Sequence, residues 1–410
     1  MADVTDLDTA LETLLWFSPP RSRGHQAIPT MSRLLRHLGD PHQAYRWVHV
    51  AGTSGKTSTA YHIRSMLEAS GQRTGLTVSP HVVAVNERVQ LDGGPLPQEA
   101  FLAHLNAFLP EARAFGEELT YFELGVALAL WTFARESVDY AVVEVGIGGT
   151  RDATNVLQRP DKLCVVGAVG RDHTEILGGS VREIAAHKAG IVGPGNVAVV
   201  LDQDAEALTE ILARVGAAGG TPTLVDAAGL PTFHERNALM ARTAVRLLSR
   251  RDGFDYVEPA TLSRPPGRFE VFTAPGRRVV IDGAHNPQKM AGLVGALESA
   301  GVGRAAVLCT LMDAPDHKLD DTLAVLAPVV SHLVVTDYAL GSGAKSKRSF
   351  PSAVVAAAAR RLGLSVETAD GVADGVARLL ARPEADLVVT GSLYLASLAR
   401  PLVTARIGGA

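Results

Sequence analysis

The segment from Val48 to Thr59, V-H-V-A-G-T-S-G-K-T-S-T, constrains the fold most. An apolar run passes through a glycine turn into a lysine and several hydroxyl residues, which predicts a β-strand, a tight turn and the start of a helix. Gly52 and Gly55 let the backbone curl so that its N–H groups face an anion. Lys56 adds a point charge, and the helix N-terminus adds partial positive charge. The segment therefore predicts a loop that binds nucleotide phosphates.

A strict Walker pattern would need a glycine where Val50 stands, so this loop is a shorter variant. The hydroxyl of Thr57 or of Ser58 can reach a Mg2+ ion. The turn resembles the ATP loop of the Mur ligase superfamily, whose members join amino acids to carboxylates through acyl phosphates. The alternative is an ordinary strand-to-helix turn with an incidental lysine. The candidate nucleotide-binding residues of the loop are Gly52, Thr53, Ser54, Gly55, Lys56, Thr57 and Ser58.

The size and charge of the chain limit its organisation and its partners. At 410 residues it exceeds what one hydrophobic core normally spans, so two domains are expected. The formal net charge is −4 and the 39 basic residues form no long runs, which argues against a nucleic-acid partner. The N-terminus is acidic and no run reaches ~18 apolar residues. We expect a cytoplasmic monomer without a membrane partner, with Cys164 and Cys309 reduced and buried.

Apolar strand-like runs alternate with amphipathic helical stretches almost throughout, which is typical of an α/β fold with mostly parallel sheets. Three prolines and a glycine interrupt this pattern between Phe254 and Arg268 and suggest a hinge. We therefore expect an N-terminal domain of residues 1–262 and a smaller, doubly wound C-terminal domain of residues 263–410.

Acidic and histidine side chains follow two of the expected strands. Glu144 stands near the end of the run Y-A-V-V-E, before a glycine-rich turn, and Asp172 and His173 follow a later run. Ligands in open α/β sheets collect at this edge. A buried carboxylate needs a positive partner, so Glu144, His173 and Ser58 form a candidate Mg2+ site. The alternatives are a carboxylate paired with lysine or arginine and a histidine with a capping or packing role.

Three further motifs have an ordinary structural reading when taken alone. Lys188 in H-K-A-G-I would complement a helix dipole before a glycine cap. Asp282 and His285 in I-D-G-A-H-N-P end a strand, where Asp282 could accept ribose hydroxyls. Ser392 and Tyr394 in T-G-S-L-Y-L also follow a strand. The motif with Asp282 and His285 and the motif with Ser392 and Tyr394 could each be a polar strand-to-helix turn.

The ordered set of motifs resembles one family, the folylpolyglutamate synthases and their bifunctional relatives with dihydrofolate synthase activity. The resemblance spans residues 48–396. It is carried by G-T-S-G-K-T-S, S-P-H with N-E-R, Y-F-E, E-V-G-I-G-G-T-R-D-A-T-N, D-H with L-G, H-K-A-G-I, E-R-N, P-G-R, D-G-A-H-N-P and G-S-L-Y-L-A-S.

This resemblance implies an ATP-binding N-terminal domain, a Rossmann-like glutamate-ligase C-terminal domain and an active site between them. ATP would phosphorylate a carboxylate of folate or dihydropteroate, and the amine of L-glutamate would then attack. Lys188 would be carbamylated and would ligate a second Mg2+ ion. By matching motif, the catalytic residues would be Lys56, Lys188 and His285, and Ser58, Glu144, His173 and Lys188 would hold metal.

The remaining roles that the resemblance implies concern the substrates. The second group of nucleotide contacts would be Asn237, Arg268 and Asp282. The acceptor side would comprise Asn86, Arg88, Tyr121, Phe122, Asp152 and Asn155. The incoming glutamate would meet His285, Ser392 and Tyr394.

Three features depart from the family pattern. Ser54 and Thr57 replace an asparagine and a glycine of its usual loop, so Thr57 competes with Ser58 as a metal ligand. The stretch from Lys188 to Asn237 is short. The segment L-M-D-A-P-D-H-K-L differs, with Lys318 as a counterpart of a family lysine. A Mur-type ligase acting on a UDP-muropeptide or another carboxylate, and a nucleotide-binding regulator without catalysis, therefore stay open as alternatives.

Overall fold

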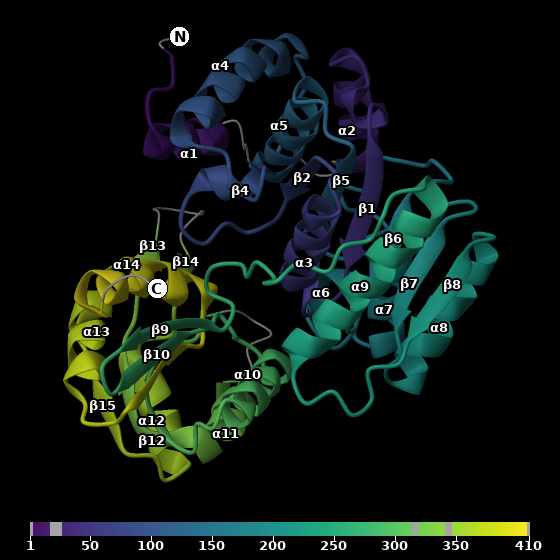
Figure 1. The fold of residues 1–410 in the computed structure, drawn as a ribbon. Coiled ribbons are helices and arrows are strands. Elements are labelled where there is room, and N and C mark those ends of the chain that lie inside the picture. The colour runs from purple at the N-terminus through teal and green to yellow at the C-terminus, as the bar shows by residue number, and fades with distance from the viewer. Residues whose placement is uncertain (1–2, 17–26, 314–318, 341–346, 408–410) are drawn as a thin grey trace. The chain divides into compact units, whose positions relative to one another are not determined.

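The computed structural model describes residues 3–16, 27–313, 319–340 and 347–407. They form two compact units, each built on its own sheet (Figure 1). The first unit comprises Met1–Gly229 and Glu235–Ser263, and the second comprises Leu230–His234 and Arg264–Ala410. The sequence did not predict that a five-residue stretch, Leu230–His234, belongs to the second unit. Lys318 lies outside the described residues.

The first unit contains an eight-stranded sheet in the order β4-β3-β2-β5-β1-β6-β7-β8. All neighbouring pairs from β2 to β8 are parallel, and only β3 and β4 are antiparallel. The sequence did not predict β3, β4 or β8. The strands are β1 Arg46–Ala51, β2 Thr74–Thr77, β3 Gln90–Leu91, β4 Gly94–Pro95, β5 Tyr140–Glu144, β6 Leu163–Val166, β7 Val197–Leu201 and β8 Thr221–Val225.

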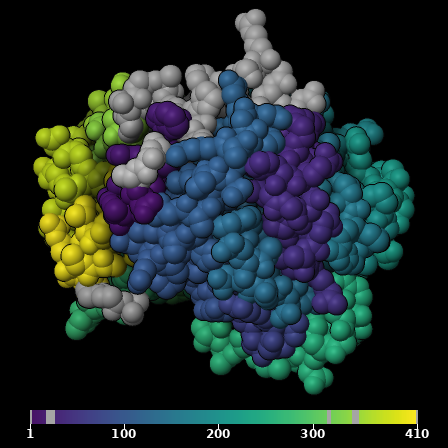
Figure 2. Space-filling view, turned by 90° about the horizontal axis from the view of Figure 1, so that it is seen from above, coloured from purple at the N-terminus to yellow at the C-terminus, as the bar shows by residue number. Residues whose placement is uncertain are grey.

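The helices of the first unit cover both faces of the sheet, because its central strands are buried and mostly apolar at nearly every position. One core joins α1, α2, α4 and α5 to Trp47 and Val143, and a second core lies under α7 and α8. Figure 2 shows purple and blue atoms of the chain's N-terminal part side by side on the surface. The helices are α1 Leu7–Trp16, α2 Ala27–His37, α3 Lys56–Ala69, α4 Gln98–Ala114, α5 Tyr121–Arg135, α6 Thr174–Leu177, α7 Val181–Ala189, α8 Ala205–Ala217 and α9 Phe233–Asp252, with short 3-10 turns η1 Pro41–Gln43 and η2 Val85–Arg88.

The second unit contains a six-stranded sheet in the order β15-β12-β11-β16-β10-β9, parallel except for β9. One core lies under α10, α11 and α12, and another lies under α13 and α14, so helices cover both faces. The elements are β9 Glu270–Ala274, β10 Arg277–Ile281, α10 Pro287–Ser299, β11 Ala305–Cys309, α11 Leu319–Leu326, η3 Ala327–Val329, β12 Val330–Val335, β13 Ala339–Leu340, β14 Lys347–Arg348, α12 Ser352–Arg361, β15 Val366–Thr368, α13 Gly371–Ala381, β16 Asp386–Thr390 and α14 Leu393–Ile407.

Two mostly parallel sheets with helices confirm the predicted α/β class. Cys164 and Cys309 are free and buried, as expected. Among the described residues, no helix is both long and apolar enough to cross a membrane.

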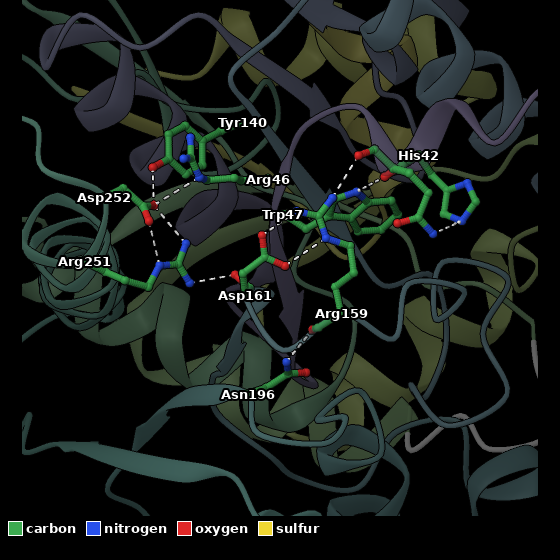
Figure 3. Close-up of polar contacts among 10 residues, drawn as sticks. His42, Arg46, Trp47, Tyr140, Arg159, Asp161, Asn196, Arg251 and Asp252 are labelled. Carbon is green, nitrogen blue, oxygen red and sulfur yellow. Dashed lines mark hydrogen bonds and ion pairs between the residues drawn. The ribbon is translucent and has the colours of Figure 1, made fainter.

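A polar network closes the amino-terminal edge of the first sheet (Figure 3). The carboxylate of Asp252, at the end of α9, accepts a hydrogen bond from the Tyr140 hydroxyl and two from the Arg251 guanidinium, both at 2.8 Å. Arg251 also donates to the backbone of Asp161, whose side chain pairs with Arg159 at 2.5 Å. This network ties α9 to the start of β5 and to the loop before β6, at the edge opposite the glycine turn.

Candidate active site

The glycine turn lies at the carboxyl end of β1, and α3 begins directly behind it at Lys56. Gly55 has φ 81, a left-handed conformation that favours glycine. The amide N–H groups of Thr53 and Ser54 donate to the carbonyl of Ala168 at 2.7 and 3.4 Å, which ties the turn to the loop after β6. These two amides are therefore already engaged, and the N–H groups of the first turn of α3 remain as the natural anion donors.

Two lysine side chains converge on this turn. The Lys56 ammonium donates to the Gly52 carbonyl at 3.0 Å, and the Lys188 ammonium donates to the same oxygen at 3.0 Å. Lys56 comes from α3 and Lys188 from the last turn of α7, where only 4% of Lys188 is exposed. Two ammonium groups that share one acceptor repel each other, and any anion bound beside them would be attracted by both.

Glu144 ends β5 next to this turn and is 3% exposed. Its carboxylate accepts a hydrogen bond from the Thr57 hydroxyl at 2.9 Å and one from the Ser79 amide at 3.2 Å. Ser58, the predicted metal ligand of the loop, is also buried, but the hydroxyl that contacts Glu144 is that of Thr57. The structure thus brings one loop hydroxyl and one carboxylate together.

His173 lies at the start of the short helix α6. It precedes α6 with φ 53, its side chain is 44% exposed, and its Nδ1 lies 3.8 Å from the Glu175 carboxylate. Among the described residues, no group of three or more histidine, cysteine, aspartate or glutamate side chains is suited to hold a metal ion. An ion at Glu144 would take hydroxyl, phosphate and water oxygens among its ligands, which is common for Mg2+.

Asn237 on α9 lies against the glycine turn. A Cβ atom built on Gly55 would be 2.4 Å from the Asn237 Oδ1 atom, so a larger residue there would have to displace the Asn237 amide. The Asn237 Nδ2 group is buried and has no hydrogen-bond partner within the part of the chain that the structure describes. A buried amide donor beside a phosphate loop is suited to a nucleotide.

The predicted acceptor residues gather around α5. The guanidinium of Arg88 covers the Tyr121 ring at 4.6 Å and donates to His81 Nδ1 at 3.2 Å. Burial, and secondarily the Arg88 charge, lower the pKa of His81 to about 4. Asn86 donates to the Leu96 carbonyl at 2.8 Å and so fixes its own loop. The sequence motif S-P-H contained His81, but its contact with Arg88 could not be read from spacing.

The loop between Gly146 and Asn155 forms the rest of this side. A Cβ atom on Gly146 would be 2.5 Å from the Phe122 ring, so the ring lies directly on the loop. Asp152 accepts hydrogen bonds from the backbone of Ile147 and from Thr154, and burial raises its pKa. Asn155 donates to the Gly190 carbonyl at 3.0 Å, and its Oδ1 atom has no partner among the described residues.

The second unit holds its predicted residues at the carboxyl ends of β10 and β16. Asp282 accepts hydrogen bonds from the amides of Phe269 and Ala284, both at 2.8 Å. Burial raises its pKa, and the nearby Arg268 charge opposes that shift. A Cβ atom on Gly283 would be 2.7 Å from Arg268 Nη1, which places the guanidinium against the strand end.

His285 has one defined tautomer in this unit. Its Nδ1 atom lies 2.8 Å from the Gly283 carbonyl, so Nδ1 carries the proton. Its Nε2 atom then accepts from the Lys289 ammonium at 3.0 Å. Lys289 was not predicted from the sequence, although its place one helical turn after His285 is a signal that could have indicated it.

Tyr338 is a further residue that the sequence did not indicate. Its hydroxyl lies 2.8 Å from the Ser392 hydroxyl, and its ring lies 5.9 Å from that of Tyr394. Ser392 also accepts from the Tyr394 amide at 3.1 Å. Burial raises the pKa of Tyr338 to about 12, so it stays protonated. The sequence signal for Tyr338 was its position just after β12, because ligand-binding residues lie at the carboxyl ends of parallel strands.

Comparison with known proteins defines the class. Residues 50–221 match the Mur ligase middle domain, and residues 267–393 match the Mur ligase glutamate ligase domain. The chain is 35% identical to a probable bifunctional folylpolyglutamate synthase/dihydropteroate synthase of Haloferax volcanii over 90% of its length, but it spans only about half of that relative, 48%. It is 31% identical to the dihydrofolate synthase/folylpolyglutamate synthase of Mycobacterium tuberculosis, covering 93% of this chain and 91% of the relative.

A solved structure agrees with these relatives. E. coli FolC in complex with DHPP and ADP superposes with a TM-score of 0.83 at 27% identity, covering 99% of this chain and 100% of that one. The chain therefore belongs to the folylpolyglutamate synthase/dihydrofolate synthase family of Mur ligases.

Proposed function

We propose that this chain is an ADP-forming ligase that adds L-glutamate to a folate through an acyl phosphate. One observation carries the proposal: Lys56 and Lys188 each lie 3.0 Å from the Gly52 carbonyl, beside the Thr57 and Glu144 pair. That arrangement suits a site where several anions meet, because phosphoryl transfer to a carboxylate needs positioning and charge neutralisation more than a strong base. Membership of the family supports the same chemistry.

The proposed reaction has two steps. A carboxylate oxygen of the acceptor attacks the γ-phosphorus of ATP, which gives an acyl phosphate and ADP. The uncharged glutamate amine then attacks the acyl carbon, loses a proton and expels phosphate. In the first step Lys56 would neutralise phosphate charge, and Asn237, Arg268 and Asp282 would hold the nucleotide. The loop residues Gly52, Thr53, Ser54, Gly55, Thr57 and Ser58 would surround the phosphates. The N–H groups at the start of α3 would donate to them, while the Thr53 and Ser54 amides hold the loop to Ala168.

The buried Glu144 carboxylate and the loop hydroxyls fit a hard divalent cation. Glu144, His173, Lys188 and a loop hydroxyl would hold two Mg2+ ions, which neutralise phosphate charge when bound. Ser58 is the expected hydroxyl ligand, and Thr57, which contacts Glu144, competes with it. Lys188 would do so as a carbamate, formed when its neutral amine adds CO2 and loses a proton. Removal of one of the two ammonium charges beside Gly52 favours that modification.

The remaining residues would bind the two other substrates. Asn86, Arg88, Tyr121, Phe122, Asp152 and Asn155 would hold the pterin acceptor. His285, Ser392 and Tyr394 would hold glutamate, with His285 offering its unprotonated Nε2 atom to a donor such as the amine or to Lys289. We also propose that the protein is a cytoplasmic monomer.

An acceptor screen tests the proposal. Purified protein, ATP, Mg2+ and L-glutamate are combined with a reduced folate, dihydropteroate or a UDP-muropeptide, and ADP and the amide product are measured. We expect product with folate, and the dihydropteroate arm decides whether the enzyme is bifunctional. Lys56→Met should abolish turnover. ADP release that is independent of every acceptor, or product with the muropeptide alone, contradicts a folate ligase.

The carbamate has its own test. Protein equilibrated with 13C-bicarbonate should show a carbamate resonance that is absent from Lys188→Ala, and a short carboxylic acid should partly restore the activity of that variant. Full activity of Lys188→Ala without added acid contradicts the modified lysine.

A further inference from the structure

His49 occupies an unusual place for a histidine. It lies in the middle of β1, three residues before Gly52, and its strand neighbours in register are Val143 of β5 and Cys164 of β6. None of its surface is exposed, and Trp47 packs edge-on against it at 6.1 Å. Burial, with a smaller contribution from Lys162, holds its pKa well below the usual value, so the imidazole is neutral. A valine would satisfy this strand position.

The hydrogen bonds of His49 fix its tautomer. The Thr154 hydroxyl donates its single proton to Asp152 Oδ1 at 2.6 Å. The same hydroxyl oxygen lies 2.9 Å from His49 Nε2, so Nε2 must be the donor and Nδ1 must be unprotonated. Nδ1 has no hydrogen-bond partner among the described residues. The His49 Nδ1 atom is thus a buried acceptor without a hydrogen bond, which lowers stability, while Nε2–H donates to the Thr154 hydroxyl.

The His49 Nε2–H donor begins a series of hydrogen bonds that hold the loop of residues 146–155. Asp152 accepts from the Thr154 amide at 3.0 Å and from the Ile147 amide at 2.9 Å, so it connects the two ends of the loop. The Phe122 ring lies on the same loop at Gly146. The Thr150 amide donates to the His187 carbonyl at 2.9 Å, next to Lys188.

We infer that His49 is a positioning residue for the acceptor side of the site. Through Thr154 and Asp152 it fixes the position of the 146–155 loop relative to β1, the strand that leads to the glycine turn. The Phe122 ring, which lies on that loop, is positioned with it. The inference rests on the proposed function for the identity of the acceptor, a folate or dihydropteroate. His49 itself contacts no reacting group. Its role predicts that the acceptor and the nucleotide will respond differently to its loss.

The test compares His49→Val with His49→Gln. Valine fills a strand position but removes the donor, whereas the glutamine Nε2 group can restore it. We expect His49→Val to raise the KM for the acceptor about fivefold, the effect of one lost hydrogen bond, and to leave the KM for ATP unchanged. Glutamine should restore the acceptor KM. Thr154→Val, which loses both the contact with His49 and the bond to Asp152, should raise the acceptor KM at least as much, and the double variant His49→Val with Thr154→Val should be no worse than Thr154→Val alone.

His42 provides a matched control. It is also a buried histidine whose Nδ1 atom has no partner among the described residues, but it lies in the network at the opposite sheet edge (Figure 3). We expect His42→Leu to leave the acceptor KM unchanged.

Hydrogen exchange of the 146–155 segment separates this inference from the proposed function. Exchange there should become faster in His49→Val and in Thr154→Val, but not in His49→Gln or His42→Leu. A wild-type protein that is inactive with folates rejects the proposed function, and the exchange experiment still decides the role of His49. Unchanged exchange in the loop, or equal changes in the KM values for acceptor and ATP, overturns the inference.

Discussion

Gly55→Ala tests the phosphate loop because the structure contains a matched control. Gly55 has φ 81 and Gly39 has φ 82, so alanine meets the same backbone strain at both positions. Around Gly39 no atom lies within 4 Å of the added Cβ atom. At Gly55 the Cβ atom would be 2.4 Å from Asn237 Oδ1 and 3.1 Å from Asn237 Cγ. The difference between the two variants therefore isolates the contact with Asn237.

The magnitudes follow from these two situations. A left-handed backbone costs alanine roughly 1–2 kcal/mol, and the lower entropy of the unfolded alanine chain returns about 0.4–1 kcal/mol. Gly39→Ala should therefore lower the free energy of unfolding by about 1 kcal/mol. Gly55→Ala must also displace the Asn237 amide, which adds about 1–2 kcal/mol. Loss of one hydrogen bond from Asn237 to the nucleotide would weaken ADP binding about fivefold.

Tryptophan fluorescence suits this assay because Trp16, Trp47 and Trp131 all belong to the first unit. Urea unfolding followed by fluorescence then reports the stability of that unit, and calorimetric titration with ADP reports affinity. The double variant Gly55→Ala with Asn237→Gly should recover the extra loss of stability but not the affinity. Equal stability and equal ADP affinity of Gly55→Ala and Gly39→Ala would refute the assignment of Asn237 to the nucleotide site.

Three further outcomes are expected. Burial alone would raise the pKa of Asp252, but hydrogen bonds from Arg251 and Tyr140 bring it below its usual value. Asp252→Asn should therefore lose about 2 kcal/mol of stability at pH 7. In urea unfolding, the gap to wild type should begin to close as pH falls to about 4, where the unfolded carboxyl titrates, and go on closing as pH falls through the lower folded pKa. Thr57→Val should raise the Mg2+ concentration needed for half-maximal activity more than Ser58→Ala, because the Thr57 hydroxyl contacts Glu144; a larger effect of Ser58→Ala contradicts this. Tyr338→Phe should raise the KM for glutamate severalfold with the KM for ATP unchanged, since it frees the Ser392 hydroxyl; parallel changes in both constants would indicate general damage.

The alternation of apolar runs and helical stretches was enough to predict the class and most central strands. β1, β7, β11 and β16 lie where buried runs of valine and leucine predicted them. The missed strands have weaker patterns. In β8 only Val225 is buried, and β3 and β4 have two residues each, so neither apolar content nor length separates them from loops.

The candidate site could be predicted as motifs but not as contacts. The glycine turn and Glu144 were indicated because both follow strands of one parallel sheet, whose carboxyl ends share an edge. Spacing carries no information on which hydroxyl meets Glu144, and Thr57 rather than Ser58 does so. His49 reads in sequence as one polar residue in a valine strand, and its role depends on Thr154, 105 positions away.

Lys188 shows how burial decides between two interpretations that the sequence alone could not separate. A lysine that complements a helix dipole keeps its ammonium in water, because the favourable field at a helix C-terminus does not offset the loss of hydration. Lys188 ends α7 as that interpretation requires, but it is only 4% exposed and its ammonium donates to Gly52, 136 residues earlier. Burial and a contact so distant in sequence both speak against a solvent-exposed helix cap. The carbamate experiment tests whether this buried lysine is modified.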